Sequence, residues 1–213
     1  MAQRIPDLIH YHAPRTRSLT IRWMLEELGI QPELRLLNLE KGEHKSAEFL
    51  AINPMGKVPT IVHKGVVITE TPAICTYLAD AFPDAALAPA MDDPARGRFF
   101  RAMFFYAACV EPAAADRAFK REAGPSIQIG YGTFESMLEG LKDIIGAGPF
   151  ILGERFTAAD VMLGAGVGYL RDFQVLPADS VLTGYVARVR ARAAYQRTVA
   201  EEAVLLEQLA AQA

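Results

Sequence analysis

The sequence contains little cysteine. Only two of its 213 residues are cysteines, Cys75 and Cys109, and they lie 34 positions apart, so neither belongs to a CxxC pair. This scarcity excludes a disulfide framework and gives no support for a cysteine-based metal site. We expect both cysteines to be small buried apolar residues.

The sequence also lacks an excess of charge and a long apolar run. Its 22 Lys and Arg against 25 Asp and Glu give 22 − 25 = −3, and no basic run offers a polyanion a binding surface. No stretch approaches 18 uncharged apolar residues, and the first seven residues do not resemble a signal peptide. We therefore expect a cytoplasmic protein that binds neither nucleic acid nor a membrane.

Apolar residues, in contrast, are plentiful. They make up 51% of the chain, which suffices for a sizeable core in one large domain or two small ones. In the first part, the apolar spacing and the turn residues predict a strand at 8–12, a helix at 18–28, a strand at 33–39, a hairpin at 59–62 and 66–69, and a helix at 72–82. This order is βαβ followed by ββα, and it predicts a right-handed crossover between parallel strands.

A linker separates this part from the rest of the chain. Residues 83–94 hold three prolines and three aspartates without apolar periodicity, which is typical of an exposed connection. We place the linker at 83–93, between an α/β domain of residues 1–82 and an all-helical domain of residues 94–213. Helical patterns in the second domain cover 95–123, 126–147, 157–173, 180–194 and 201–209.

Three motifs carry a resemblance to a known family. NPMGKVPT at residues 53–60 stands before the hairpin, TETPAI at 69–74 follows it, and ERFTAAD at 154–160 lies in the helical part. In this order and spacing they resemble the glutathione S-transferase family over nearly the whole chain. The resemblance implies a thioredoxin-like N-terminal domain with a mixed four-stranded sheet, an all-α C-terminal domain, a homodimer, glutathione as co-substrate and no metal.

The resemblance assigns the main contacts of glutathione. Val58 would pair through its backbone with the cysteinyl part, with Pro59 in the cis form, although an X-Pro bond by itself is cis only about 5–6% of the time. Glu70 and Thr71 stand at a helix start, where free N–H groups favour an anion, and by resemblance they hold the γ-glutamyl end. Judged by the residues alone, Thr71 is also a plausible N-cap.

Three basic residues complete the assigned site. By resemblance, His44, Lys45 and Lys57 face the glycyl carboxylate of glutathione. Their surroundings in the sequence are polar, so a solvated turn is the alternative interpretation for each of them.

Catalysis requires a group that lowers the pKa of the glutathione thiol. At the reference value of about 8.5, only a few per cent is thiolate at pH 7. A drop of two units needs about 2.7 kcal/mol, which one hydroxyl donor and a helix N-terminus jointly supply. We expect that hydroxyl to be Thr16, then Ser18, then Tyr11. Arg15 or Arg17, acting by charge, and simple capping by Thr16 or Ser18 are the alternatives.

The second substrate is expected beside the first helix of the second domain. Residues 99–106 include six large apolar side chains, which cannot all face one side of a helix, so most belong to the core. We assign Tyr106 and Met103 to the substrate pocket. The predicted function is detoxification by a glutathione transferase that adds the thiolate to hydrophobic electrophiles and can also reduce organic hydroperoxides. The alternative is a non-catalytic binding or regulatory protein of the same fold.

One motif has a structural explanation. Thr157 and Asp160 have the T-x-x-D spacing of a capping box, and Phe156 precedes the cap. We expect this motif to stabilise a helix start and to contribute no chemistry of its own.

Overall fold

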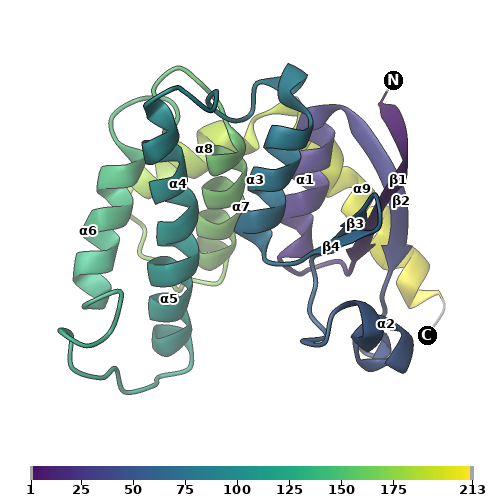
Figure 1. The fold of residues 1–213 in the computed structure, drawn as a ribbon. Coiled ribbons are helices and arrows are strands. Elements are labelled where there is room, and N and C mark those ends of the chain that lie inside the picture. The colour runs from purple at the N-terminus through teal and green to yellow at the C-terminus, as the bar shows by residue number, and fades with distance from the viewer. Residues whose placement is uncertain (1, 212–213) are drawn as a thin grey trace. The chain divides into compact units, whose positions relative to one another are not determined.

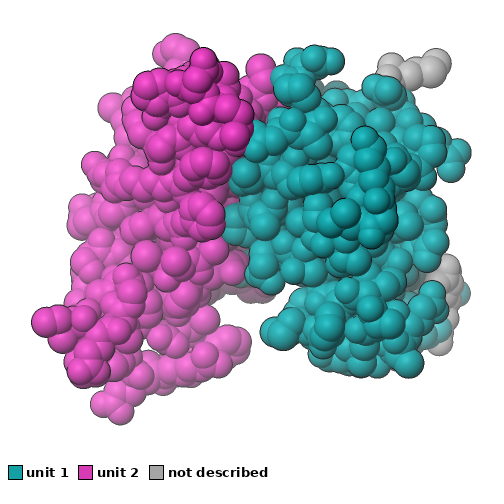
Figure 2. Space-filling view, viewed as in Figure 1, with its two compact units in different colours: residues 1–85, 192–213 teal, residues 86–191 magenta. Residues whose placement is uncertain are grey.

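The structure is a computed structural model that describes residues 2–211 (Figure 1). Contacts divide the chain into two compact units, coloured separately in Figure 2: residues up to 85 together with those from 192 onward form unit 1, and residues 86–191 form unit 2. Met1 and Ala213, the outer ends of the two expected domains, lie outside the described residues.

Unit 1 is built on a mixed four-stranded sheet with strand order β2-β1-β3-β4. Strands β1 and β2 pair in parallel, whereas β3 runs antiparallel to both β1 and β4. The expected βαβ-ββα order and the thioredoxin-like topology are confirmed. The strands are β1 (Gln3–His12), β2 (Ile30–Leu36), β3 (Thr60–His63) and β4 (Val66–Ile68).

The helical segments of unit 1 lie between these strands and after them along the chain. They are α1 (Ser18–Leu28), η1 (Glu43–Lys45), α2 (Ala47–Ile52), α3 (Thr71–Ala81), η2 (Pro83–Ala85) and α9 (Ala193–Ala210). Helix α1 buries Ile21, Trp23 and Met24 completely and packs against both α3 and α9. It ends at Gly29, whose φ of 66° is the left-handed conformation that glycine adopts without a Cβ penalty.

The last helix differs from expectation, because α9 packs with unit 1 and not with the helical segment 94–213 to which chain order assigned it. The ring of Tyr195 lies edge-on to Trp23 of α1, with 4.9 Å between centroids. Arg192 donates to both carboxylate oxygens of Glu27, each at 2.7 Å. Aromatic packing and an ion pair therefore hold the C-terminal helix α9 against α1 of unit 1.

Unit 2 is helical, as expected. Within the described part of the chain it has no strand, only isolated bridges between residues 150 and 155. Helix α7 is buried along almost its whole length and forms the centre of this unit. The helices are α4 (Ala95–Phe105), the π-helical turn η3 (Tyr106–Val110), α5 (Glu111–Ala118), α6 (Phe134–Ile145), α7 (Ala158–Asp172) and α8 (Ser180–Arg190).

The start of α7 confirms the capping box. The Asp160 carboxylate accepts the N–H of Thr157 at 2.9 Å. It also accepts the N–H of Ile151 at 2.9 Å and the hydroxyl of Tyr185 at 3.1 Å. Burial raises the pKa of Asp160 to about 6 in spite of these donors. The motif therefore ties together a loop and two helices in the core of unit 2.

The two cysteines lie in different environments. Cys75 is fully buried, as expected, whereas the expectation for Cys109 is wrong because this residue is partly exposed. Burial raises the pKa of both thiols. Among residues 2–211, no helix is long and apolar enough to span a membrane.

Candidate functional site

Three segments of unit 1 leave the sheet at the same end. Tyr11, next to the end of β1, pairs with Thr60 at the start of β3. Strand β3 also pairs with β4, where Ile61 lies opposite Ile68. Because β3 is antiparallel to both neighbours, β1 and β4 end where β3 begins. The register therefore brings together the loop after β1, the Val58–Pro59 bond and the start of α3.

The NPMGKVPT motif builds the turn before β3. The Val58–Pro59 bond is cis, as the resemblance predicts. The side-chain amide of Asn53 donates to the carbonyl of Lys57 at 2.9 Å and to the hydroxyl of Thr60 at 3.0 Å. The buried asparagine thus holds both sides of the turn, while Lys57 is exposed and Val58 half-buried.

The start of α3 combines an open helix terminus with a carboxylate. Glu70 has φ 64° and ψ 117°, which L residues rarely adopt. It occupies the N-cap position, so the expected capping role of Thr71 is wrong, and among the described residues no side chain caps this helix. The first-turn N–H groups favour an anion and the exposed Glu70 carboxylate favours a cation. Such a pair suits the carboxylate and ammonium groups of an amino-acid end.

The basic residues of η1 lie against the same motif. The Lys45 ammonium donates to the carbonyl of Met55 at 3.0 Å. Gly56 has φ 60°, and a Cβ there would lie 2.6 Å from the carbonyl oxygen of His44 and 2.8 Å from the Lys45 ammonium. Only glycine permits this approach, which brings Lys45 to the segment that carries Lys57 and Val58.

The hydroxyls of the loop after β1 have unequal access to solvent. Ser18 is fully buried. Its Oγ accepts the N–H of Ala13 at 3.2 Å and lies 2.9 Å from the Ala13 carbonyl and 2.7 Å from His12 Nδ1. Thr16 is half-buried; its Oγ1 lies 2.7 Å from Ser18 Oγ and donates to the Ala13 carbonyl at 2.7 Å. Thr16 is therefore the more accessible hydroxyl, and Ser18 lies behind it.

The other candidates in and next to this loop are Tyr11, Arg15 and Arg17. Tyr11 is 6% exposed and its ring packs against Phe49, 5.3 Å between centroids. Since side chains alternate along a strand, Tyr11 faces away from His12, which contacts Ser18. Arg15 is exposed with φ 61°, and Arg17 occupies the N-cap position of α1.

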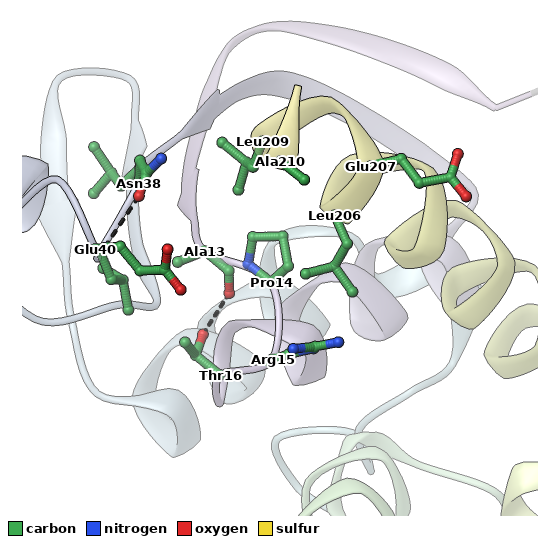
Figure 3. Close-up of a pocket in the computed structure, with 12 residues that line it drawn as sticks. Ala13, Pro14, Arg15, Thr16, Asn38, Glu40, Leu206, Glu207, Leu209 and Ala210 are labelled. Atoms are coloured by element: carbon green, nitrogen blue, oxygen red, sulfur yellow. Dashed lines mark hydrogen bonds between the residues drawn. The ribbon is translucent and has the colours of Figure 1, made fainter. Parts of the chain in front are cut away.

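A pocket of about 560 Å³ opens beside Thr16. Figure 3 shows α9 side chains, including Leu206 and Leu209, on one side of Pro14, and Asn38 with Glu40 on the other. The wall is mainly apolar, and Thr16 forms part of it. All of the lining residues belong to unit 1: Ala13, Pro14, Arg15, Thr16, Leu37, Asn38, Leu39, Glu40, Leu206, Glu207, Leu209 and Ala210.

The expected substrate residues of unit 2 lie elsewhere. Met103 and Tyr106 have no exposed surface. A Cβ on Gly166 of α7 would lie 2.2 Å from the hydroxyl oxygen of Tyr106, so this ring packs directly on the helix backbone. Both side chains fill the core of unit 2, as most of this aromatic segment was expected to do. Their placement does not support a substrate-binding role.

Sequence reasoning missed two residues behind Thr16. His12 is fully buried between Ser18 and α9, where its Nε2 lies 2.7 Å from Glu202 Oε1. A histidine directly before the loop is visible in the sequence as a possible base. Glu202 carries no such signal, because it reaches the loop only through the packing of α9 on α1.

The comparisons with known proteins identify the family of this chain. Residues 6–80 match the model for the glutathione S-transferase N-terminal domain, and residues 112–199 match the model for the C-terminal domain. Glutathione S-transferase A of Pleuronectes platessa is 30% identical over 160 residues, which cover 70% of this chain and 71% of that protein. The chain belongs to the glutathione S-transferase family.

Other similarities extend this result. Glutathione S-transferase theta-2 of Homo sapiens is 32% identical over 144 residues, covering 63% of this chain and 59% of that protein's length. A glutathione transferase homologue from Sulfitobacter, solved with bound glutathione, has a TM-score of 0.75 at 27% identity and covers 92% of this chain and 99% of its own. A glutathione transferase from Methylococcus capsulatus has a TM-score of 0.77, also at 27% identity, with the same coverage.

Proposed function

We propose that this protein is a glutathione transferase that binds glutathione at the end of the unit 1 sheet and adds its thiolate to a hydrophobic electrophile. The observation that carries the proposal is the meeting of the cis Val58–Pro59 bond, the open start of α3 and the Thr16 loop at one end of the sheet. Family membership supports the same conclusion.

Each part of glutathione has a chemically matched partner. The α-carboxylate of the γ-glutamyl end suits the N–H groups at the start of α3, and its ammonium suits Glu70. The backbone of Val58 is available to pair with the cysteinyl peptide group. Lys45 and Lys57, which lie on adjoining segments, are suitable partners for the glycyl carboxylate, with His44 beside them.

Thr16 is the hydroxyl best suited to activate the thiol. It is half-buried, it lines the pocket, and it lies at the start of α1. A hydroxyl that donates to the thiolate and the positive end of the helix dipole both favour the ionised sulfur. Arg15 also lines the pocket and remains the alternative, through its charge.

The apolar pocket beside Thr16 is suited to the second substrate. Leu206 and Leu209 of α9, with Leu37 and Leu39, supply an apolar wall next to the hydroxyl that would hold the sulfur. A hydrophobic electrophile bound there would lie close to the thiolate, and an organic hydroperoxide would fit the same surface. Family membership also supports a homodimer.

Thermal unfolding with and without millimolar reduced glutathione tests the proposal. A ligand at 100 times its Kd stabilises the folded state by about 2.7 kcal/mol, which raises the Tm of a protein of this size by several degrees. We expect Glu70→Gln to lose this shift. The matched control is Asp84→Asn, which changes an exposed acid outside the site and should keep it.

Two results would contradict the proposal. No saturable shift in the wild-type protein would remove glutathione as its ligand. A shift without thiolate absorbance near 240 nm at neutral pH, and without conjugation of any hydrophobic electrophile, would instead favour the non-catalytic binding protein.

A further inference from the structure

A continuous chain of close polar contacts runs inward from Thr16. Thr16 Oγ1 lies 2.7 Å from Ser18 Oγ, and Ser18 Oγ lies 2.7 Å from His12 Nδ1. On its other side, His12 Nε2 lies 2.7 Å from Glu202 Oε1 of α9. Ser18 and His12 are fully buried, and the Glu202 side chain is 10% exposed. The chain therefore begins at the pocket and ends at a buried carboxylate.

This chain has the chemical order hydroxyl, imidazole, carboxylate. An imidazole that touches a hydroxyl with one nitrogen and a carboxylate with the other is held in position to take a proton, because the carboxylate stabilises the imidazolium. In this protein the hydroxyl next to the imidazole, Ser18, is buried and cannot itself attack a substrate. Thr16 connects it to the pocket.

We propose that Ser18, His12 and Glu202 form a proton relay that receives the thiol proton of bound glutathione through Thr16 and holds it on His12. The inference rests on the proposed glutathione site and adds a destination for the proton. Thr16 is the catalytic residue, since it touches the sulfur, whereas Ser18, His12 and Glu202 act through it as positioning residues.

The proton transfer balances as follows. Before transfer, the thiol donates to Thr16 Oγ1, the Thr16 hydroxyl turns its proton from the Ala13 carbonyl to Ser18 Oγ, and Ser18 donates to His12 Nδ1. Each hydroxyl then passes its own proton toward His12 and takes up the proton that arrives from the pocket side. Both hydroxyls therefore stay neutral. The S–H bond breaks, an N–H bond forms at Nδ1, and the sulfur keeps the electron pair. The products are a thiolate that accepts from Thr16 and an imidazolium beside Glu202.

The charged groups around His12 fit this role. From α9, Glu202 provides the negative charge. From α1, Arg22 lies with its Nε 3.6 Å from Glu202 Oε1, and it also pairs with Glu201, which offsets its charge. From β1, His10 lies 5.4 Å away between ring centroids; burial, together with the charges of His12 and Arg22, lowers its pKa well below the ordinary value. His10 is therefore neutral at pH 7 and does not compete for the proton.

Proton counting on the wild-type protein gives the most direct test. Calorimetric titration with glutathione at pH 7, in two buffers of different ionisation enthalpy, measures the protons released on binding. S-methylglutathione, which has no thiol proton, corrects for other groups. The relay predicts a thiolate band near 240 nm with almost no proton release, because the proton stays on the protein. Release of one proton per thiolate formed would overturn the proposal.

Variants test the same point through the pH at which the band is half-formed. His12→Asn keeps a side chain that can accept from Ser18 but cannot take a proton, so the midpoint should rise by about one unit or more, with glutathione affinity unchanged. Glu202→Gln should give a smaller rise. The matched control is His63→Asn: His63 is also buried on a strand and contacts a hydroxyl, Tyr77, at 2.8 Å, but it lies outside the chain. Its midpoint should stay that of the wild type.

The outcomes separate the relay from the proposed function. If glutathione produces no thermal shift in the wild-type protein, the proposed function fails and the relay falls with it. If glutathione binds and forms thiolate, but His12→Asn and Glu202→Gln keep the wild-type midpoint, the relay alone is wrong. Should His12→Asn not fold, the proton count of the wild-type protein and the midpoint of Glu202→Gln decide the matter.

Discussion

The helix starts of this protein differ in whether a side chain caps them. In unit 2, helices α6, α7 and α8 begin with side-chain caps: Thr133 accepts the N–H of Ser136, Asp160 that of Thr157, and Asp179 those of Val181 and Leu182. In unit 1, no side chain between residues 2 and 211 caps the start of α3, whereas at the start of α1 the Thr16 hydroxyl accepts the N–H of Ser18 at 3.2 Å.

A capped helix start and an open one have different consequences for the protein. A capped start satisfies its own N–H groups and adds about 0.5–2 kcal/mol to stability. An open start forgoes that gain and keeps its partial positive charge available to an anion. The open start of α3 lies at the end of the sheet where the Thr16 loop, Val58 and Glu70 meet. The three capped starts of unit 2 thus contribute to folding, whereas the start of α3 in unit 1 leaves its N–H groups open to an anion.

The largest effect on stability is expected at a capped helix start, that of α7. Asp160→Ala removes a buried carboxylate that accepts from Thr157, Ile151 and Tyr185, and it leaves these donors unsatisfied. The free energy of unfolding should fall by about 3 kcal/mol or more in chemical denaturation. The matched control is Asp143→Ala, which breaks the exposed ion pair with Arg101 and should cost less than about 0.5 kcal/mol. Equal losses in the two variants would contradict the structural role of the capped start.

The same carboxylate predicts a pH dependence of stability. The pKa of Asp160 is raised from 3.8 to about 6, so between these values the folded state binds more protons than the unfolded state. The contribution of this group is therefore complete below about pH 4 and is lost as the pH rises to 6, by as much as about 3 kcal/mol. Denaturation at pH 4, 5, 6 and 7 should show this fall relative to Asp160→Asn. Parallel curves for the two proteins would contradict it.

A smaller effect is expected at the Thr16 loop, and it should appear in the rate of conjugation. Thr16→Val removes the hydroxyl and keeps the shape of the side chain. Because a hydrogen bond to a charged group contributes about 1.5–3 kcal/mol, kcat/KM for conjugation should fall about 10- to 100-fold with glutathione affinity retained. Thr16→Ser, the matched control, should keep most of the activity. A wild-type rate in Thr16→Val would transfer the role to Arg15 or Arg17.

Local patterns predicted most of the fold. The spacing of Ile21, Met24 and Leu25 together with Gly29 predicts α1, and the T-x-x-D spacing predicts the start of α7. These features depend on contacts between residues near one another in the chain, so the sequence displays them directly. The glutathione motifs are equally local, and the cis bond at Val58–Pro59 followed from resemblance to the family.

The errors arose where a residue's environment depends on distant segments. Tyr106 and Met103 have the composition of a substrate pocket, but the packing of α7 places both in the core. Thr71 resembles a cap in sequence, but α3 begins one residue earlier than a Thr71 cap requires, with Glu70 at the N-cap. Local residue type alone does not distinguish these possibilities.

By itself, therefore, the sequence determined the two-part architecture, the family and the residues expected to contact glutathione, because each is written in a short motif or in apolar spacing. Only the tertiary structure decided that α9 belongs to unit 1, that Thr16 is more accessible than Ser18, and that Glu202 lies against His12. The physical reason is that burial and charge pairing are properties of segments brought together by folding, and chain order carries no record of which segments those will be.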